Sequence, residues 1–399
     1  MLKLDIMKKI FYIIIFIFIV FGAFWGGFFT AKHYGVLPDN LLNFQSNFFS
    51  GQNLTLFWEA WQAVSNKFID REKIDQKKAF YGALQGMVKS IGDDYTEFYS
   101  PQEAKIFNED ISGSFEGVGM EITVRRGIIT VVSPLEDTPA WKAGIKSGDL
   151  ILKINNEDAT NLKLEEAVMK IRGPKGTKVI LTIMREDFKE PKDIEIVRDV
   201  IVVHAVKFKM LENNIGYIKI LNFGKNSVPE FYNAINDLLT KGANKLILDL
   251  RNNPGGFLES AVIISSWFLP KGDKVVIEDF GGKSPQRIHR SLGPGILSNL
   301  PLVVLVNRGS ASASEILAGA LRDNLNVKIL GEKTFGKGSV QEVVNLSDGS
   351  LVKVTVARWL TPKGKLIEGK GIDPDIEIKN ESDKEDLVLN KAIEILKNK

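Results

Sequence analysis

The stretch LVVLVNRGSASASEILAGALRDN, residues 302–324, decides the fold. Its apolar run at 302–306 predicts a buried strand, and the apolar spacing after Ser314 predicts a helix. A strand that turns directly into a helix is the repeating unit of an α/β sheet. Because the first N–H groups of a helix have no partner within it, such a turn can also bind a negatively charged oxygen.

Three serines, Ser310, Ser312 and Ser314, alternate with alanines in this turn and leave two interpretations open. In the first, one serine is a nucleophile, projected from a rigid strand-to-helix junction. In the second, Ser312 and Glu315, three residues apart, form only a capping box at the start of the helix. The turn by itself favours the cap, so a nucleophile requires a base elsewhere in the chain.

Histidine is a poor candidate for that base. The chain has three histidines, none with an acidic or serine motif beside it: His33, His204 and His289. Lysine can replace histidine where its surroundings lower its pKa from about 10.4 toward 7. Lys337 lies between two glycines in GEKTFGKGSVQEV, residues 331–343, and we expect nearby Phe335 to give its amine an apolar setting. A solvated turn lysine is the alternative.

Two further features complete a candidate site. Gln341 follows Lys337 by four residues and is placed to orient the amine. LILDLRNNPGGFLESA, residues 246–261, predicts a strand that turns through Gly255 and Gly256 into a helix. Paired glycines at such a junction expose backbone N–H groups to a ligand. Together the three turns would bring a nucleophile, a base and oxyanion donors to the strand ends of one domain.

Composition limits the remaining choices. With 44% hydrophobic and 25% charged residues, the 399-residue chain has an ordinary globular composition and room for several domains. The net charge of +3 gives no reason to expect a nucleic-acid partner. Zero cysteines exclude disulfides and thiolate chemistry. No metal-ligand spacing is present, so we expect neither a metal nor a cofactor.

The N-terminus predicts a membrane anchor. Residues 10–31, IFYIIIFIFIVFGAFWGGFFTA, carry no charge over 22 positions. As a helix they would extend about 33 Å, enough for a hydrocarbon core of about 30 Å. Three lysines precede this segment, so residues 1–9 should be cytoplasmic and the rest periplasmic or extracellular. A cleaved signal peptide is the alternative.

The remaining chain divides by pattern. A linker at 32–53 precedes a helical region at 54–112, where apolar residues recur every three or four positions. Residues 113–188 read as short strands with one or two helices, and 189–380 as a domain of alternating strands and helices. A lysine-rich surface helix or tail is expected at 381–399. The fold class is therefore a multidomain α/β chain behind a transmembrane helix.

Four long motifs, in this order, resemble those of the C-terminal processing peptidases, also called tail-specific proteases. They are DLRNNPGG (249–256), VLVNRGSASASEILAGAL (304–321), GEKTFGKGSVQ (331–341) and LTPKGKLIEGKGIDPDI (360–376). The resemblance runs from about Leu54 to Glu377. IGDDYTEFYSP at 91–101 is also similar to a segment typical of the family's helical region.

The resemblance implies a Ser-Lys dyad in an α/β catalytic domain of the crotonase-like type. Ser312 would be the nucleophile, Lys337 its base and Gln341 an assisting residue. The oxyanion donors would be the N–H of Ala313 and one N–H from Gly255 or Gly256, a choice that the sequence leaves open. The activity implied is that of a serine endopeptidase.

The resemblance also implies that residues 113–188 form a PDZ domain. In FEGVGMEI (115–122), four residues would offer backbone donors to a C-terminal carboxylate: Gly117, Val118, Gly119 and Met120. The bound peptide would add as a strand beginning at Glu121 and Ile122. Three helical residues would line the pocket for its last side chain: Ala167, Val168 and Ile171. We hypothesise that Arg172, a cation beside this pocket, reports peptide binding to the catalytic domain.

Expected partners are protein or peptide substrates with free C-termini, and the bilayer through residues 10–31. Phe57, Trp58 and Trp61 are candidates to pair two protomers, with ordinary core packing as the alternative. Two other functions remain open: a non-catalytic PDZ scaffold on the membrane, and an acyl-thioester hydratase or hydrolase suggested by fold analogy. The presence of Ser312, Lys337 and Gln341 argues against the scaffold. The lack of an acidic general base with comparable support, and the expected periplasmic or extracellular location, argue against the thioester enzyme.

Overall fold

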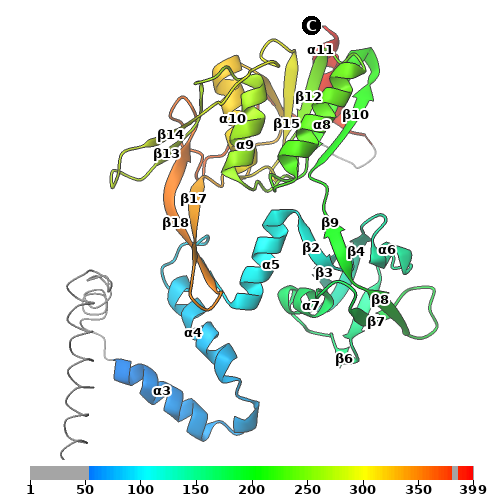
Figure 1. Cartoon of the computed structure of the whole chain (residues 1–399), viewed down its shortest axis with the longest axis vertical. Helices are drawn as coiled ribbons and strands as arrows, with labels where there is room; N and C mark the ends of the chain where they lie inside the picture. Colours follow the sequence, from blue (N-terminus) through cyan, green and yellow to red (C-terminus); the bar gives the residue numbers. More distant parts are fainter. Residues whose placement is uncertain (1–53, 380–384, 399) are drawn as a thin grey trace, which may run out of the picture. The chain divides into compact units, whose positions relative to one another are not determined.

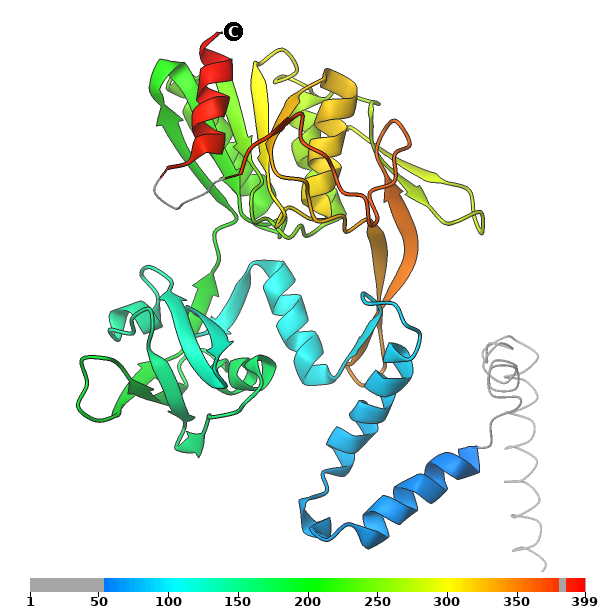
Figure 2. The same cartoon turned by 180° about the vertical axis from the view of Figure 1, so that it is seen from behind.

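The computed structural model describes residues 54–379 and 385–398 (Figures 1 and 2). The predicted anchor at 10–31 and the linker at 32–53 lie outside these residues. Within the described ranges, no helix is both long and apolar enough to span a bilayer. The chain divides into two compact units, the first ending at Ala79 and the second beginning at Phe80.

The first unit, from its first described residue, is helical. It contains α3 (Leu54–Lys67), η1 (Arg71–Lys73) and the beginning of α4 (Gln76–Lys89). α3 buries none of its residues. Phe57 and Trp58 are 49% and 58% exposed, and their rings lie edge to face with centroids 5.5 Å apart. The spacing of apolar residues therefore predicts α3 correctly. Within the described part of the chain, however, the aromatic side chains of α3 are not packed in a hydrophobic core.

The second unit begins with the rest of α4, followed by β1 (Glu97–Tyr99) and α5 (Pro101–Ser112). α5 has Ser100 as its N-cap and Pro101 as its first residue, as the sequence predicts. Beyond it, β2 (Ser114–Gly117) pairs with β9 (Asp199–Val202) in a separate two-stranded sheet.

A small β-rich module comes next. Its sheet has the order β3-β4-β5-β7-β8, with β6 paired to β5, so β3 lies at an edge. The strands are β3 (Met120–Arg125), β4 (Ile128–Pro134), β5 (Leu150–Ile154), β6 (Glu157–Asp158), β7 (Lys178–Met184) and β8 (Lys192–Val197). The helices are α6 (Pro139–Lys142) and α7 (Leu164–Ile171), the second of which is the helix expected from LKLEEAVMKIRG. Ile129, Ile151 and Leu181 form part of its own closed core.

The α/β domain is built on a six-stranded sheet of order β10-β11-β12-β15-β16-β19. β10 is antiparallel, and the other neighbours are parallel. The strands are β10 (Val206–Leu211), β11 (Ile215–Ile220), β12 (Lys245–Asp249), β15 (Leu302–Val306), β16 (Lys328–Gly331) and β19 (Ile376–Glu377), with η2 (Glu212–Asn214) between the first two. α8 (Ser227–Thr240), α9 (Leu258–Phe268) and α10 (Ala313–Leu325) share a core with one face of this sheet. The predicted α/β alternation is confirmed.

The last helix corrects an expectation. α11 (Leu387–Lys397) was expected from its lysines to be a surface helix, but Val388, Ala392 and Leu396 are buried against the second face of the sheet (Figure 2). These three residues recur every four positions and form a narrow apolar stripe among charged neighbours. With helices on both faces, all five residues of β15 are buried.

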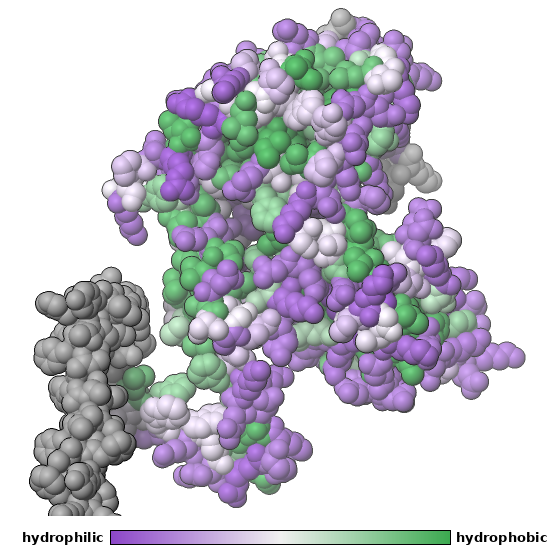
Figure 3. Space-filling view, in the orientation of Figure 1, coloured by the Kyte–Doolittle hydropathy of each residue, from purple (hydrophilic) through white to green (hydrophobic). Residues whose placement is uncertain are grey.

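A second sheet, antiparallel, extends from this domain. It contains β13 (Lys274–Asp279), β14 (Arg287–Arg290), β17 (Ser339–Asn345) and β18 (Leu351–Leu360), and β1 pairs with β18. Hydrophobic residues lie on the surface of the β17–β18 ribbon (Figure 3), where Val343 and Val344 are each about 40% exposed. This sheet places the lysine turn at the beginning of β17, beside β1 and β18.

Candidate active site

Ser312 occupies the junction between β15 and α10 in a strained conformation. Its backbone has φ 53° and ψ −116°, whereas neither Ser310 nor Ser314 has a positive φ. A non-glycine residue in such a region costs about 1–3 kcal/mol and is retained where the surroundings impose it, often at functional sites. The strand-turn-helix position is also the one in which nucleophile elbows hold a serine. Backbone geometry therefore distinguishes the middle serine.

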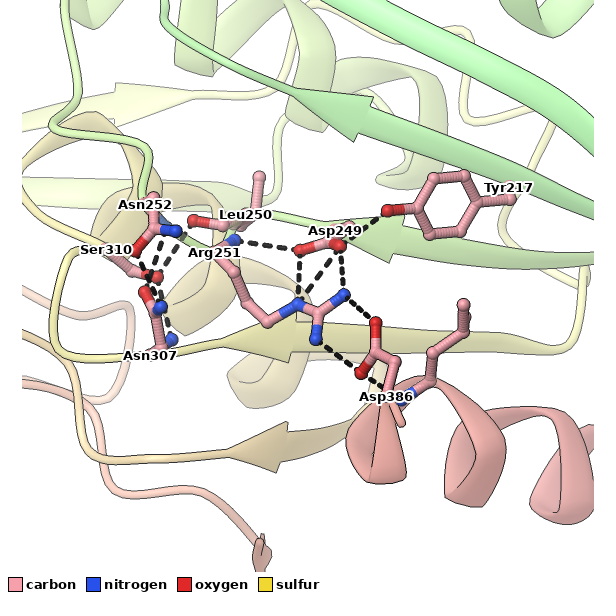
Figure 4. A network of polar contacts seen from close by, with 9 residues as sticks. Tyr217, Asp249, Leu250, Arg251, Asn252, Asn307, Ser310 and Asp386 are labelled. Carbon is pink, nitrogen blue, oxygen red and sulfur yellow. Dashed lines mark hydrogen bonds and ion pairs between the residues drawn. The ribbon is translucent and has the colours of Figure 1, made fainter. Parts of the chain in front are cut away.

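The other two serines have structural roles. Ser310 is fully buried, donates to the carbonyl of Leu250 at 2.8 Å and accepts the Asn307 N–H at 3.0 Å (Figure 4). Ser314, equally buried, donates to the carbonyl of Asn253 at 3.0 Å. Ser312 is only half-buried. Its hydroxyl is thus the one that a substrate can reach.

Glu315 connects the serine turn to the lysine turn. Its fully buried carboxylate accepts the Ser312 N–H at 2.8 Å and the Lys337 N–H at 2.9 Å. The same carboxylate accepts the Gly336 N–H at 2.7 Å and the Thr334 hydroxyl at 2.5 Å. Burial raises the pKa of Glu315, against the opposing effect of these donors. The capping box is present, but its glutamate also holds the two turns together, which spacing alone does not reveal.

Lys337 lies apart from its predicted partners. Its Nζ is 5.0 Å from the ring centroid of Tyr95, and within the described residues it makes no hydrogen bond to Ser312 or Gln341. Gln341 donates instead to Ser339 Oγ at 2.7 Å. Burial, and secondarily the charge of Lys353, lowers the pKa of Lys337. A lowered pKa suits a base, although the amine lies against the Tyr95 ring rather than in a hydrogen bond to Ser312.

The apolar setting of Lys337 has a different source from the expected one. Phe335 is 62% exposed, so it does not enclose the amine as its place in the sequence suggested. The aromatic ring beside the amine belongs to Tyr95, more than 200 positions earlier. Tyr95 was missed because only the tertiary fold brings the two residues together, although it lies in the quoted segment IGDDYTEFYSP.

Of the predicted oxyanion donors, Ala313 follows Ser312 directly and Gly255 touches it. A Cβ on Gly255, which has φ 105°, would lie 2.7 Å from the Cβ of Ser312, so the glycine allows the two turns to touch. The Gly255 N–H donates to Asn253 Oδ1 at 2.9 Å. By contrast, the N–H groups of Ala313 and Gly256 have no acceptor among the described residues. Of the two glycines, Gly256 has the free donor.

A buried ionic network holds the end of β12, where the glycine-containing turn begins (Figure 4). Fully buried Asp249 accepts from Arg251 Nη2 at 2.6 Å and from the Tyr217 hydroxyl at 2.6 Å. Arg251 also binds Asp386, the N-cap residue of α11, with its Nη1 2.7 Å from Oδ1. Desolvation and Asp249 raise the pKa of Tyr217. The network attaches the turn that follows Leu250 to both the sheet and α11, and sequence reasoning had assigned it no role.

His33 lies outside the described residues, and the other two histidines have carboxylate neighbours that the sequence did not reveal. His204 Nδ1 is 3.1 Å from Glu230, and His289 Nε2 is 3.2 Å from Glu278. Neither ring forms a hydrogen bond with a serine hydroxyl in the described part of the chain. Nor do the described residues contain a cluster of three His, Cys, Asp or Glu side chains suited to a metal ion.

The peptide pocket expected beside β3 is only partly as predicted. A cavity of about 60 Å³ is lined by Phe115, Val118, Gly119, Met120, Ile122, Val168, Ile171 and Arg172. Ala167 is instead fully buried in the module's core, because it lies on the inward face of α7. Gly117 and Glu121 do not line the cavity, and Phe115 was not predicted. Within the described residues, the N–H groups of Val118 and Gly119 have no acceptor.

Arg172 joins this cavity to α5. Its guanidinium lies 4.1 Å from the Phe115 ring centroid, 2.6 Å from Asp110 Oδ1 and 3.3 Å from Glu109 Oε2. Its side chain is only 17% exposed. The cation therefore contacts both the pocket wall and the helix that follows β1.

Comparisons with known proteins agree with this architecture. The model of peptidase family S41 matches residues 214–378, and that of the PDZ domain matches residues 130–185. The carboxy-terminal processing protease CtpA of Bacillus subtilis is 41% identical over 319 residues, which are 80% of this chain and 67% of the relative. A carboxy-terminal-processing protease of Bartonella bacilliformis is 37% identical over 366 residues, covering 91% of this chain and 82% of the relative.

A solved structure, the photosystem II D1 C-terminal processing protease, has 31% sequence identity and a TM-score of 0.51. The match covers 82% of this chain and 93% of that one. With the fold described above, these matches define the class of protein as a serine-type peptidase that carries a PDZ domain. The chain belongs to peptidase family S41, the family of the carboxy-terminal processing proteases.

Proposed function

We propose that the chain is a membrane-anchored endopeptidase that engages protein C-termini outside the cytoplasm and cleaves with a Ser312–Lys337 dyad. The observation that carries the proposal is the strained backbone of Ser312, tied through Glu315 to the backbone of Lys337. One buried carboxylate thus sets the spacing of nucleophile and base. The periplasmic or extracellular location rests on residues 10–31 of the sequence.

In the catalytic step, neutral Lys337 takes the proton of Ser312 Oγ as that oxygen attacks a peptide carbonyl. Gln341 turns from Ser339 to orient the amine. The oxyanion is held by the free N–H groups of Ala313 and Gly256, each worth about 3–4 kcal/mol to the transition state. The protonated lysine then gives its proton to the leaving amine, and water hydrolyses the acyl-enzyme.

Substrate engagement begins at the PDZ domain. The free N–H groups of Val118 and Gly119 suit a terminal carboxylate, and β3 offers an unpaired edge for strand addition. Arg172 is the proposed reporter of occupancy, since it contacts both the cavity and α5. The crotonase-like assignment of the catalytic domain is supported by the parallel strands β11, β12, β15 and β16, with the candidate oxyanion turns after β12 and β15. Self-association through α3 is supported by its exposed aromatic residues.

The test is casein cleavage by the purified full-length chain in detergent. Ser312→Ala should abolish cleavage, whereas Ser314→Ala, which removes a buried structural hydroxyl, should retain activity with lower thermal stability. A non-catalytic PDZ scaffold would bind C-terminal peptides without any hydrolysis by the wild type. Unchanged cleavage by both Ser312→Ala and Lys337→Ala would show that the dyad assignment is wrong.

A further inference from the structure

The segment that precedes α5 is fixed on the hairpin that carries the lysine turn. Asp93 Oδ2 accepts the hydroxyls of Thr96 at 2.5 Å and Thr355 at 2.6 Å. Thr96 Oγ1 in turn accepts the Thr355 N–H at 3.1 Å. Further along the segment, Lys353 Nζ lies 2.5 Å from Glu97. These bonds to β18 lie on both sides of Tyr95, so its ring is held in place by the backbone around it.

Lys337 meets the face of that ring. The ammonium is 5.0 Å from the ring centroid, within the range of a cation–π interaction, and Lys337 and Tyr95 are both half-buried. Nothing else among the described residues holds this nitrogen by a hydrogen bond or ion pair. A ring face attracts an ammonium and has no comparable attraction for a neutral amine. The contact therefore favours the protonated lysine, which cannot act as a base.

We propose that Tyr95 is a positioning residue for the base: its ring holds the Lys337 ammonium in a resting position, and the ammonium must leave that ring before Ser312 can be deprotonated. The inference rests on the proposed dyad. It gives the segment at 91–101 a role in the timing of catalysis. Tyr95 and Arg172 are joined by one stretch of chain, because β1 and α5 lead from the tyrosine to the Asp110 carboxylate that binds the arginine.

Other charges face the same lysine and will contribute to its titration. They are Glu97 on β1, Lys353 on β18 and Glu368 in the loop after β18, with Glu315 of α10 bound to the lysine's own N–H. Glu97 and Glu368 favour the protonated lysine, and Lys353 opposes it. None of these charged groups changes when the Tyr95 ring is replaced. Burial, the largest cause of the lowered pKa of Lys337, would be relieved by a smaller side chain and would raise that pKa, so a shift to lower pH reports loss of the ring face.

The experiment measures kcat/KM for casein peptide cleavage against pH, using the full-length chain in detergent. Tyr95→Phe keeps the ring face, whereas Tyr95→Leu removes it. Loss of an interaction that favours the ammonium lowers the pKa of the base. The acid limb of the kcat/KM profile, where activity rises as the base loses its proton, should therefore move to lower pH. We expect a shift of about one pH unit for Tyr95→Leu and a near wild-type profile for Tyr95→Phe. Cleavage without an activating peptide should also rise in Tyr95→Leu.

Tyr232→Leu is the matched control, because Tyr232 is half exposed on α8 and packs against the ring of Trp267 rather than against a cation. It should leave the acid limb unchanged. An unmoved limb in Tyr95→Leu, or equal shifts in Tyr95→Leu and Tyr95→Phe, would overturn the proposal. If Tyr95→Leu does not fold, fluorinated phenylalanines at position 95 can weaken the attraction of the ring face for the ammonium stepwise. The acid limb should then move to lower pH with each added fluorine. An acid limb that stays at the same pH would also overturn the proposal.

The dyad and the role of Tyr95 can be refuted separately. Unchanged cleavage by Ser312→Ala and Lys337→Ala would remove the dyad itself, whatever the variants at position 95 do. An intact dyad with a pH profile that is insensitive to the ring would remove only the role of Tyr95.

Discussion

Glu315→Gln offers a quantitative test of how the site is held together. The carboxylate of Glu315 accepts four hydrogen bonds, of which three come from backbone N–H groups. Glutamine keeps the shape but replaces one accepting oxygen with a donor, which then faces N–H groups. We expect at least one or two buried N–H groups to lose their acceptor, at about 1–3 kcal/mol each. The expected loss of stability is therefore about 3 kcal/mol.

That loss can be measured by thermal unfolding. For a domain of this size, 1 kcal/mol corresponds to about 2–4 °C in Tm, so Glu315→Gln should unfold about 6–12 °C lower. Activity should fall further than stability, because Ser312 and Lys337 both depend on this carboxylate for their backbone position. A displacement of about 1 Å can cost about 100-fold in rate. We expect kcat/KM, measured well below the lowered Tm, to fall by roughly that factor.

Glu230→Gln is the matched control. Glu230 also accepts two backbone N–H groups, from Ala205 and Val206 at 2.8 and 2.9 Å, but it contacts neither catalytic turn. This variant should lower Tm and leave kcat/KM close to the wild-type value. Equal kcat/KM for Glu315→Gln and the wild type would refute the claim that this carboxylate sets the geometry of the dyad.

Three further predictions follow from the described contacts. Because burial lowers the pKa of Lys337, the protonated lysine destabilises the fold as pH falls below about 10.4. Lys337→Met should therefore have a higher Tm than the wild type at pH 7 and the same Tm at pH 10.5. Equal Tm values for the variant and the wild type at pH 7 would contradict this. Arg172→Ala should lose the stimulation of cleavage by an activating C-terminal peptide, whereas Lys175→Ala, in the same loop, should keep it; equal stimulation in Arg172→Ala would remove that role. Asp386→Asn keeps a good helix cap but weakens the pair with Arg251, and should cost about 1–2 kcal/mol in guanidinium unfolding; an unchanged midpoint would show that the pair is not stabilising.

Several helices and strands were predictable because they have strong local signals. β15 is a continuous apolar run, α10 begins at a capping box, and Pro101 marks the first residue of α5. The choice of Ser312 among three serines depended on the resemblance to a family. The structure adds a physical reason for this choice. The buried hydroxyls of Ser310 and Ser314 donate hydrogen bonds to backbone carbonyls of the adjacent turn, whereas the Ser312 hydroxyl does not.

What could not be predicted depends on contacts between distant parts of the chain. No local pattern connects Tyr95 to Lys337, whereas Phe335 is only two positions from Lys337 in the sequence and is mostly exposed. At α7, one position separates Val168, which lines the cavity, from Ala167, which lies in the core, and a rotation of about 100° per residue decides between them.

The central claim is that Ser312 and Lys337 act as one unit. The most direct measurement is kcat/KM for casein peptide cleavage by Ser312→Ala, Lys337→Ala and the double variant. Residues that act as a unit have strongly non-additive effects. We predict that each single variant falls to the same low rate as the double variant. Substantial activity in Lys337→Ala, or a double variant whose loss equals the product of the two single losses, would contradict the account.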